Sequence, residues 1–179
     1  MTSKIKLVLL LLSVAVLGGC ASGVTRMEAG APGTGAAAPA KVEQTVKSVN
    51  LFLSEDAKKL VSDNLKFNQD ALRSIIERAL GGQNMVKADA SQTLDVEITS
   101  FRTRSNFTAI MFGFMAGNDN VEGVVSIKDA SGKILKRAKV SASYALGGLA
   151  GGQDDARMNW LYEEFAKHTV AELTGVPAK

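Results

Sequence analysis

The chain has 179 residues, of which 46% are hydrophobic and 22% are charged, and its formal net charge is +3. Lys4 and Lys6 lie in an N-terminal leader, so removal of residues 1–19 leaves 19 basic and 18 acidic side chains, a net charge of +1. Nucleic-acid binding needs excess or clustered positive charge, and this balance argues against nucleic acid as a partner. The remaining length suits a single domain with its own core.

Residues 1–19 have the pattern of a secretory signal peptide. Two lysines precede an apolar run at 7–17, and Gly18 and Gly19 precede Cys20. The run has about eleven residues, whereas a transmembrane helix needs about twenty. We therefore expect an export signal and no permanent membrane span.

The residues LGGC at 17–20 resemble the lipobox of bacterial lipoproteins. The resemblance implies that Cys20 is linked to diacylglycerol and N-acylated after cleavage, and stable anchoring follows from several acyl chains. Cys20 is the only cysteine, so no internal disulfide competes for it. The alternative is an ordinary signal peptide that is cut near Ala21 and Ser22. Ala21 stands where enterobacterial inner-membrane lipoproteins have Asp, so we expect a periplasm-facing anchor in the outer membrane of a Gram-negative bacterium.

After the lipidated cysteine, residues 20–41 are rich in Ala, Gly, Ser, Thr and Pro. A segment with so few large apolar side chains cannot offset its ordering entropy, so we expect a flexible tether with a span of about 25 Å. A single periplasmic domain is then expected over residues 42–175.

The predicted elements of the domain follow one another in the order strand, helix, three strands and helix. Residues 46–53 form a strand, and a helical pattern starts after the N-cap Ser54 and continues to Leu80, with a bend or a second helix around Asn64 and Asn68. Strands are expected near 94–99, 121–128 and 134–144, the last two joined by a turn at 129–132, and a final helix at 154–173. The sequence predicts an α+β fold: a small, mostly antiparallel sheet with two main helices packed on one face.

An apolar segment at 107–117 lies between two of the predicted strands. Its apolar residues recur neither at the spacing of a helix nor at that of a strand. Its large side chains are Phe107, Ile110, Met111, Phe112, Phe114 and Met115. Three interpretations are open: a buried connection, a lip that binds a lipid or an envelope protein, and a surface that dips into the bilayer. Arg102 and Arg104 precede it and could bind an anionic head group or a partner's carboxylate, although an exposed strand edge explains them as well. Asn118 and Asp119 are interpreted as a turn.

Catalytic motifs are absent from the sequence, and we expect neither an enzyme nor a cofactor. The glycines at 147–152 lack the Lys-Ser/Thr pair of a phosphate loop, and one histidine with one cysteine makes a poor zinc site. A periplasmic hydrolase with an unrecognised site is the alternative. It would use His168 or the acidic pairs Asp154 with Asp155 and Glu163 with Glu164.

Together with the lipobox, five stretches of sequence resemble proteobacterial lipoproteins of the family called domain of unknown function 4410. These stretches are DVEITSFRTRS, GNDNVEG, KDASGKIL, ASYALGG and RMNWLYEEFAKH, and the similarity spans about residues 46–173. The resemblance implies a compact α+β envelope domain and assigns no reaction. We therefore expect a membrane-anchored, non-enzymatic binding or assembly domain; a purely structural envelope component is a further hypothesis.

Overall fold

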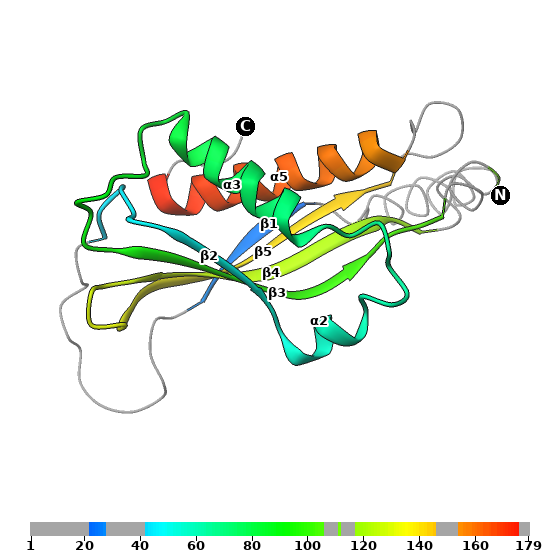
Figure 1. Cartoon of the computed structure of the whole chain (residues 1–179), viewed down its shortest axis with the longest axis horizontal. Coiled ribbons are helices and arrows are strands. Elements are labelled where there is room, and N and C mark those ends of the chain that lie inside the picture. Colours follow the sequence, from blue (N-terminus) through cyan, green and yellow to red (C-terminus); the bar gives the residue numbers. More distant parts are fainter. Residues whose placement is uncertain (1–21, 28–41, 106–110, 112–116, 146–153, 176–179) are drawn as a thin grey trace, which may run out of the picture.

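The computed structural model describes residues 22–27, 42–105, 111, 117–145 and 154–175. They form an α+β domain with one five-stranded mixed sheet and three helices, and its strand order is β1-β5-β4-β3-β2 (Figure 1). The strands are β1 (Gly23–Met27), β2 (Val49–Leu53), β3 (Thr93–Arg102), β4 (Asp119–Lys128) and β5 (Ile134–Tyr144). The helices are α2 (Glu55–Lys59), α3 (Gln69–Gly81) and α5 (Asp154–Thr174).

The sheet is mixed, which corrects the prediction of a mostly antiparallel sheet. Strands β1, β5, β4 and β3 pair antiparallel, but β2 pairs parallel to β3, with Val49 opposite Leu94 and Leu53 opposite Ile98. A parallel pair needs a long crossover, and α2 and α3 supply it between the two strands. Strands β2 and β3 therefore form a β-α-β unit, β3, β4 and β5 continue as a meander, and β1 adds to the other edge beside β5.

The predicted helical pattern after Ser54 divides into two helices. The Ser54 side chain accepts a hydrogen bond from the Ala57 amide and caps α2, and Asn68 caps α3 in the same way through the Ala71 amide. Between them, Asn64 accepts a bond of 2.8 Å from the Thr103 amide. Asn68 thus starts α3, and Asn64 attaches the connection between the two helices to the residue that follows β3.

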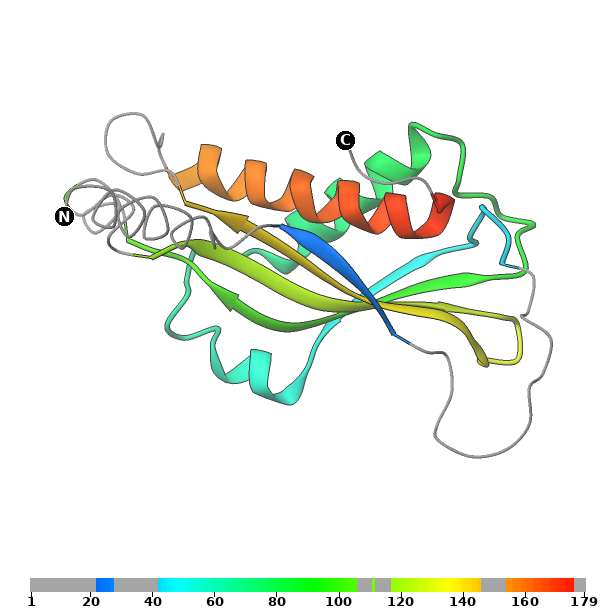
Figure 2. The ribbon, with the colours of Figure 1, turned by 180° about the vertical axis from the view of Figure 1, so that it is seen from behind.

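The two longer helices cover one face of the sheet, as predicted, while the short α2 lies on the other side (Figures 1 and 2). The core between α3, α5 and the sheet is built from fully buried side chains. The largest include Leu72, Ile76, Leu80, Leu94, Ile98, Phe101, Leu161, Tyr162 and Phe165. One apolar layer of this size accounts for the association of both helices with the sheet.

A β-bulge explains why Phe101 belongs to this core although it breaks the alternation of Leu94, Val96 and Ile98. The register with β4 shifts between Ile98 and Ser100, which returns the next large side chain to the buried face. Phe101 is 2% exposed and stacks on Phe67 with ring centroids 3.9 Å apart. The bulge thus extends the core to the end of β3.

Strand β1 lies inside the segment that was predicted to be a flexible tether. Residues 23–27 pair with β5 over five positions, from Gly23 opposite Ser141 to Met27 opposite Arg137. This segment has few large apolar side chains, so its order depends on main-chain hydrogen bonds, and the edge of β5 supplies the partners for them. The tether prediction is therefore wrong for these residues, and the folded domain begins before residue 42.

Candidate functional site

A buried ionic cluster lies at the end of the sheet where β3 finishes and β4 begins. Asp119, the first residue of β4, is fully buried, and its Oδ2 lies 3.0 Å from Arg104 Nη2 and 3.3 Å from Arg157 Nε. Its Oδ1 accepts a further bond of 2.6 Å from the Arg104 amide. Both arginines are 3% exposed, so one carboxylate is held by two cations away from water.

This cluster ties together three segments that are distant in the sequence. The Arg104 guanidinium donates to the carbonyl oxygens of Gly117 at 2.7 Å and Tyr144 at 3.2 Å. The Arg157 guanidinium, from α5, donates to the Arg104 carbonyl oxygen at 3.0 Å. The two ends of the β3–β4 connection, the end of β5 and the start of α5 are therefore bound to one another.

The structure separates the two arginines that the sequence analysis grouped. Arg102 is exposed, and its Nη1 lies 3.4 Å from the carbonyl oxygen of Asn118. Arg104 lies in the buried cluster, so its prediction as a surface arginine that binds an anionic partner is wrong. The reason is Asp119, which was interpreted as part of a turn but starts β4 and takes up the Arg104 side chain.

Sequence reasoning missed Arg157 and the structural role of Asp119. A signal existed for Arg157, which stands four residues before Leu161 and so falls on the buried stripe of α5. A basic residue in such a stripe needs a buried acceptor. The identity of that acceptor depends on tertiary contacts and could not be read from spacing.

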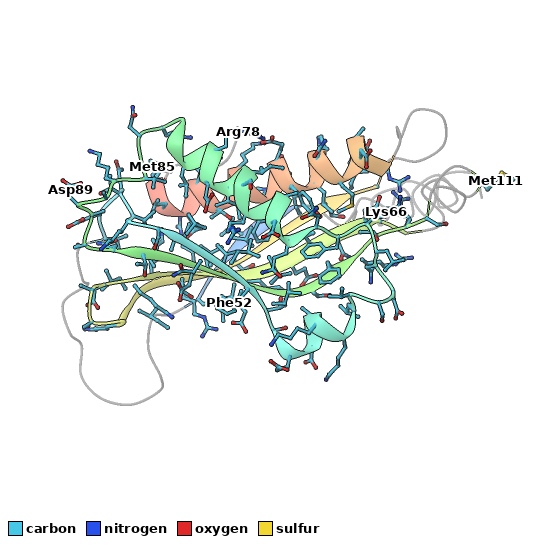
Figure 3. The ribbon with its side chains drawn as sticks, in the orientation of Figure 1. Phe52, Lys66, Arg78, Met85, Asp89 and Met111 are labelled. Carbon is cyan, nitrogen blue, oxygen red and sulfur yellow. The ribbon has the colours of Figure 1, made fainter. Side chains whose placement is uncertain are left out.

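Most of the predicted interaction segment lies outside the described residues. Phe107, Ile110, Phe112, Phe114 and Met115 belong to this undescribed part, as do Cys20 and the glycines at 147–152. Met111 is described, and 63% of it is exposed. Figure 3 shows Met111 toward the same end of the molecule as Lys66, and Met85 and Asp89 at the opposite end.

Among the candidate groups for hydrolysis, Glu164 and His168 lie beside each other, while Glu163 has a partner on another helix. Glu163 pairs with Arg78 of α3, while Glu164 lies 3.1 Å from Lys167 and 3.2 Å from His168 on its own helix. Asp155 is exposed. Among the described residues no three His, Cys, Asp or Glu side chains gather in a way that could hold a metal ion.

Two shallow grooves mark the surface of the described part. One, of about 540 Å³, is lined by Phe52, Leu53, Ser54, Glu55, Lys58, Gln69 and Glu97. The other, of about 360 Å³, is lined by Lys66, Asn68, Ala71, Asp155, Met158, Asn159 and Tyr162. Burial raises the pKa of Tyr162 to about 12, and its hydroxyl accepts a bond of 2.7 Å from the Asn68 amide, so this phenol serves the fold.

None of the helices in the described ranges combines the length and apolar character required to cross a bilayer.

Comparison with solved structures finds bacterial proteins of similar arrangement. The PelC dodecamer from Paraburkholderia phytofirmans gives a TM-score of 0.48 at 10% identity, with 84% of this chain and 97% of that chain covered. A Caulobacter crescentus protein provisionally identified as a lipoprotein gives 0.44 at 15% identity, with coverages of 77% and 97%. A minor lipoprotein from Acinetobacter baumannii gives 0.39 at 11% identity, with coverages of 72% and 93%.

No curated protein matches the chain in sequence. The model of a domain family of unknown function, DUF4410, matches residues 35–148, which is more than half of the chain and includes β2, β3, β4 and β5. The ionic cluster draws Arg104 and Asp119 from this matched range and Arg157 from beyond it. This chain therefore belongs to the DUF4410 family.

Proposed function

We propose that this protein is a membrane-anchored envelope lipoprotein whose domain binds or assembles with another envelope component and catalyses no reaction. The proposal places the lipid on Cys20 and the anchor in the outer membrane, facing the periplasm. Two features of the sequence support it: the signal-peptide pattern is followed directly by LGGC, and the cysteine of that stretch is the only one in the chain. The family has no assigned function, so the binding role must be argued from the domain itself.

The observation that carries the binding role is the buried cluster of Arg104, Asp119 and Arg157. Burying three charges is costly unless they satisfy one another, and an apolar core of the same volume would often be as stable. Here Arg104 donates hydrogen bonds to the Asp119 carboxylate and to the Gly117 carbonyl oxygen. These bonds fix both ends of the β3–β4 connection. These fixed ends, with the exposed Met111 between them in the chain, suit a surface that contacts a partner.

The contacts of the acidic side chains support a non-enzymatic role. General acid and base catalysis needs groups that converge on a substrate within hydrogen-bond reach. Glu163 and Glu164 instead form ion pairs in different directions, one with α3 and the other along α5.

Two measurements test the proposal. In cells, labelled palmitate should enter the wild-type protein and be absent from Cys20→Ser, and equal labelling of both would refute the lipid anchor. A photoreactive amino acid at Met111 should give discrete adducts on illumination, whether to protein or to lipid. The matched control carries the probe at Val86, which is 39% exposed. Adducts that are equally frequent at both positions would refute binding through this end of the domain.

A further inference from the structure

The position of β1 limits how far the folded domain can stand from its lipid anchor. Gly23 begins the strand, only three residues after Cys20. A chain spans at most about 3.6 Å per residue, so the backbone of Gly23 lies within about 11 Å of that of Cys20. The expected tether of about 25 Å therefore cannot separate the domain from the membrane.

Strand pairing identifies which end of the domain this is. Because β1 runs antiparallel to β5, its start lies beside the end of β5, where Gly23 is opposite Ser141. Ser22 continues the contact, since its Oγ accepts a bond of 2.9 Å from the Ser143 amide. Asp119, in the ionic cluster, is in turn paired with Tyr144, the last residue of β5. The start of β1 and the ionic cluster thus lie at the same end of the sheet.

Contacts from α5 hold β1 in this position. Glu172, which is 4% exposed, lies 3.4 Å from Arg26 of β1 and 3.2 Å from Lys136 of β5. Val24 packs against the core. Side-chain contacts thus add to the main-chain pairing, and the first strand is part of the domain.

The same end presents side chains that suit a membrane interface. Trp160 is 43% exposed, and its ring lies 4.9 Å from that of Tyr144, the residue after Ser143. Tryptophan and tyrosine are enriched where bilayers meet water because their rings are amphipathic. Met111 adds an exposed apolar side chain from the β3–β4 connection, and Arg102 an exposed cation that suits lipid phosphate.

We propose that the domain lies with this end against the surface of the bilayer, and that Trp160 enters the interfacial region. The proposal rests on the lipidation of Cys20 in the proposed function. It adds that the membrane itself is a binding partner of the end of the domain that carries Met111 and Trp160. The short covalent distance keeps this end close to the lipid headgroups. The apolar and aromatic side chains then gain from contact with the interface.

Trp160 is the only tryptophan of the chain and therefore reports on its own environment. The mature full-length lipoprotein is reconstituted in vesicles of phosphatidylethanolamine and phosphatidylglycerol whose acyl chains carry bromine near the headgroup. Bromine quenches tryptophan at short range, so Trp160 emission should fall by about twofold or more relative to unbrominated vesicles.

The matched control moves the tryptophan to the other end of the domain. In Trp160→Phe with Val86→Trp, the probe follows Met85, which Figure 3 places opposite Met111. Val86 also bridges to Val46, before the start of β2. Its emission should be nearly unchanged by brominated lipid, and circular dichroism should be that of the wild type.

Equal quenching of the two proteins, or no quenching of Trp160 in a folded and lipidated protein, would overturn the proposal. Unquenched Trp160 with a protein adduct at position 111 would assign this end to a protein partner instead. Mass spectrometry of the same sample separates this outcome from a failure of lipidation. If cells leave Cys20 unmodified, the proposed anchor is wrong. A chain expressed without residues 1–19 keeps that single thiol, and a maleimide phospholipid coupled to it then tests the docking alone, with the same expected and contradicting results.

Discussion

Replacing Asp119 with Asn tests whether the buried cluster stabilises the end of the sheet. Asn keeps the shape of the side chain and one acceptor oxygen, but it removes the negative charge. Asp119 accepts bonds from the Arg104 amide and guanidinium and lies 3.3 Å from Arg157 Nε. The substitution leaves two arginines buried without their common counterion.

The expected loss of unfolding free energy is about 3–5 kcal/mol, the range found when one partner of a buried ion pair is removed. It is large because both arginines are 3% exposed, so water cannot replace the carboxylate without opening the structure. Such a loss is a substantial part of the total stability of about 5–15 kcal/mol that is usual for a domain.

Urea unfolding followed by circular dichroism measures this loss, and Glu122→Gln is the matched control. Glu122 lies on the same strand and pairs with Lys139 at 2.6 Å, but the two side chains are 36% and 51% exposed, so we expect a change of about 0–1 kcal/mol. Similar small losses in both variants would refute the reasoning. If Asp119→Asn does not fold, adding Arg157→Met should restore part of the stability, because it removes one of the unpaired cations.

Three further predictions concern the core and the first strand. Tyr162 should ionise near pH 12 in absorbance titration at 295 nm, and Tyr162→Phe should remove that late phase. Because the unfolded phenol ionises first, near pH 10, this group's contribution to stability should fall as pH rises from about 10 to 12. Gly123→Ala should lower the free energy of unfolding in urea by about 1–3 kcal/mol, since a Cβ there would meet the Glu97 carbonyl oxygen at 2.9 Å. Gly23→Ala is the control, because nothing lies within 4 Å of a Cβ at that position. An equal loss in the two variants would contradict the prediction. Glu172→Gln should speed hydrogen exchange of the β1 amides several-fold while central β4 amides are unchanged, and equal effects on both strands would argue against Glu172 as the contact that holds β1.

Local signals predicted most of the domain's elements. The alternation of Leu94, Val96 and Ile98 predicted β3, and the turn at 129–132 with the apolar alternation after it predicted the β4–β5 hairpin. Ser54 predicted the cap of α2, and the apolar spacing after Asn68 predicted the buried face of α3, whereas the cap by Asn68 was not predicted. These features depend on neighbouring residues, so the sequence contains their causes.

The parallel pairing of β2 with β3 could not be derived in this way. It depends on where the crossover helices return the chain, which is a property of packing against the whole sheet. The order of secondary elements was therefore predictable, whereas the neighbours and directions of the strands were less so.

The sequence by itself predicted the α+β class, which the structure confirms, and an export signal with a lipobox cysteine, which stay predictions. Only the tertiary structure decided that Arg104 is buried with Asp119 and Arg157, and that Gly23–Met27 form a strand. Each of these depends on partners far away in the chain, since β1 is ordered by the edge of β5 and the arginines by a carboxylate from another strand. Spacing along a sequence encodes contacts within one helix or strand, while charge pairing and edge pairing are selected by which segments the core brings together.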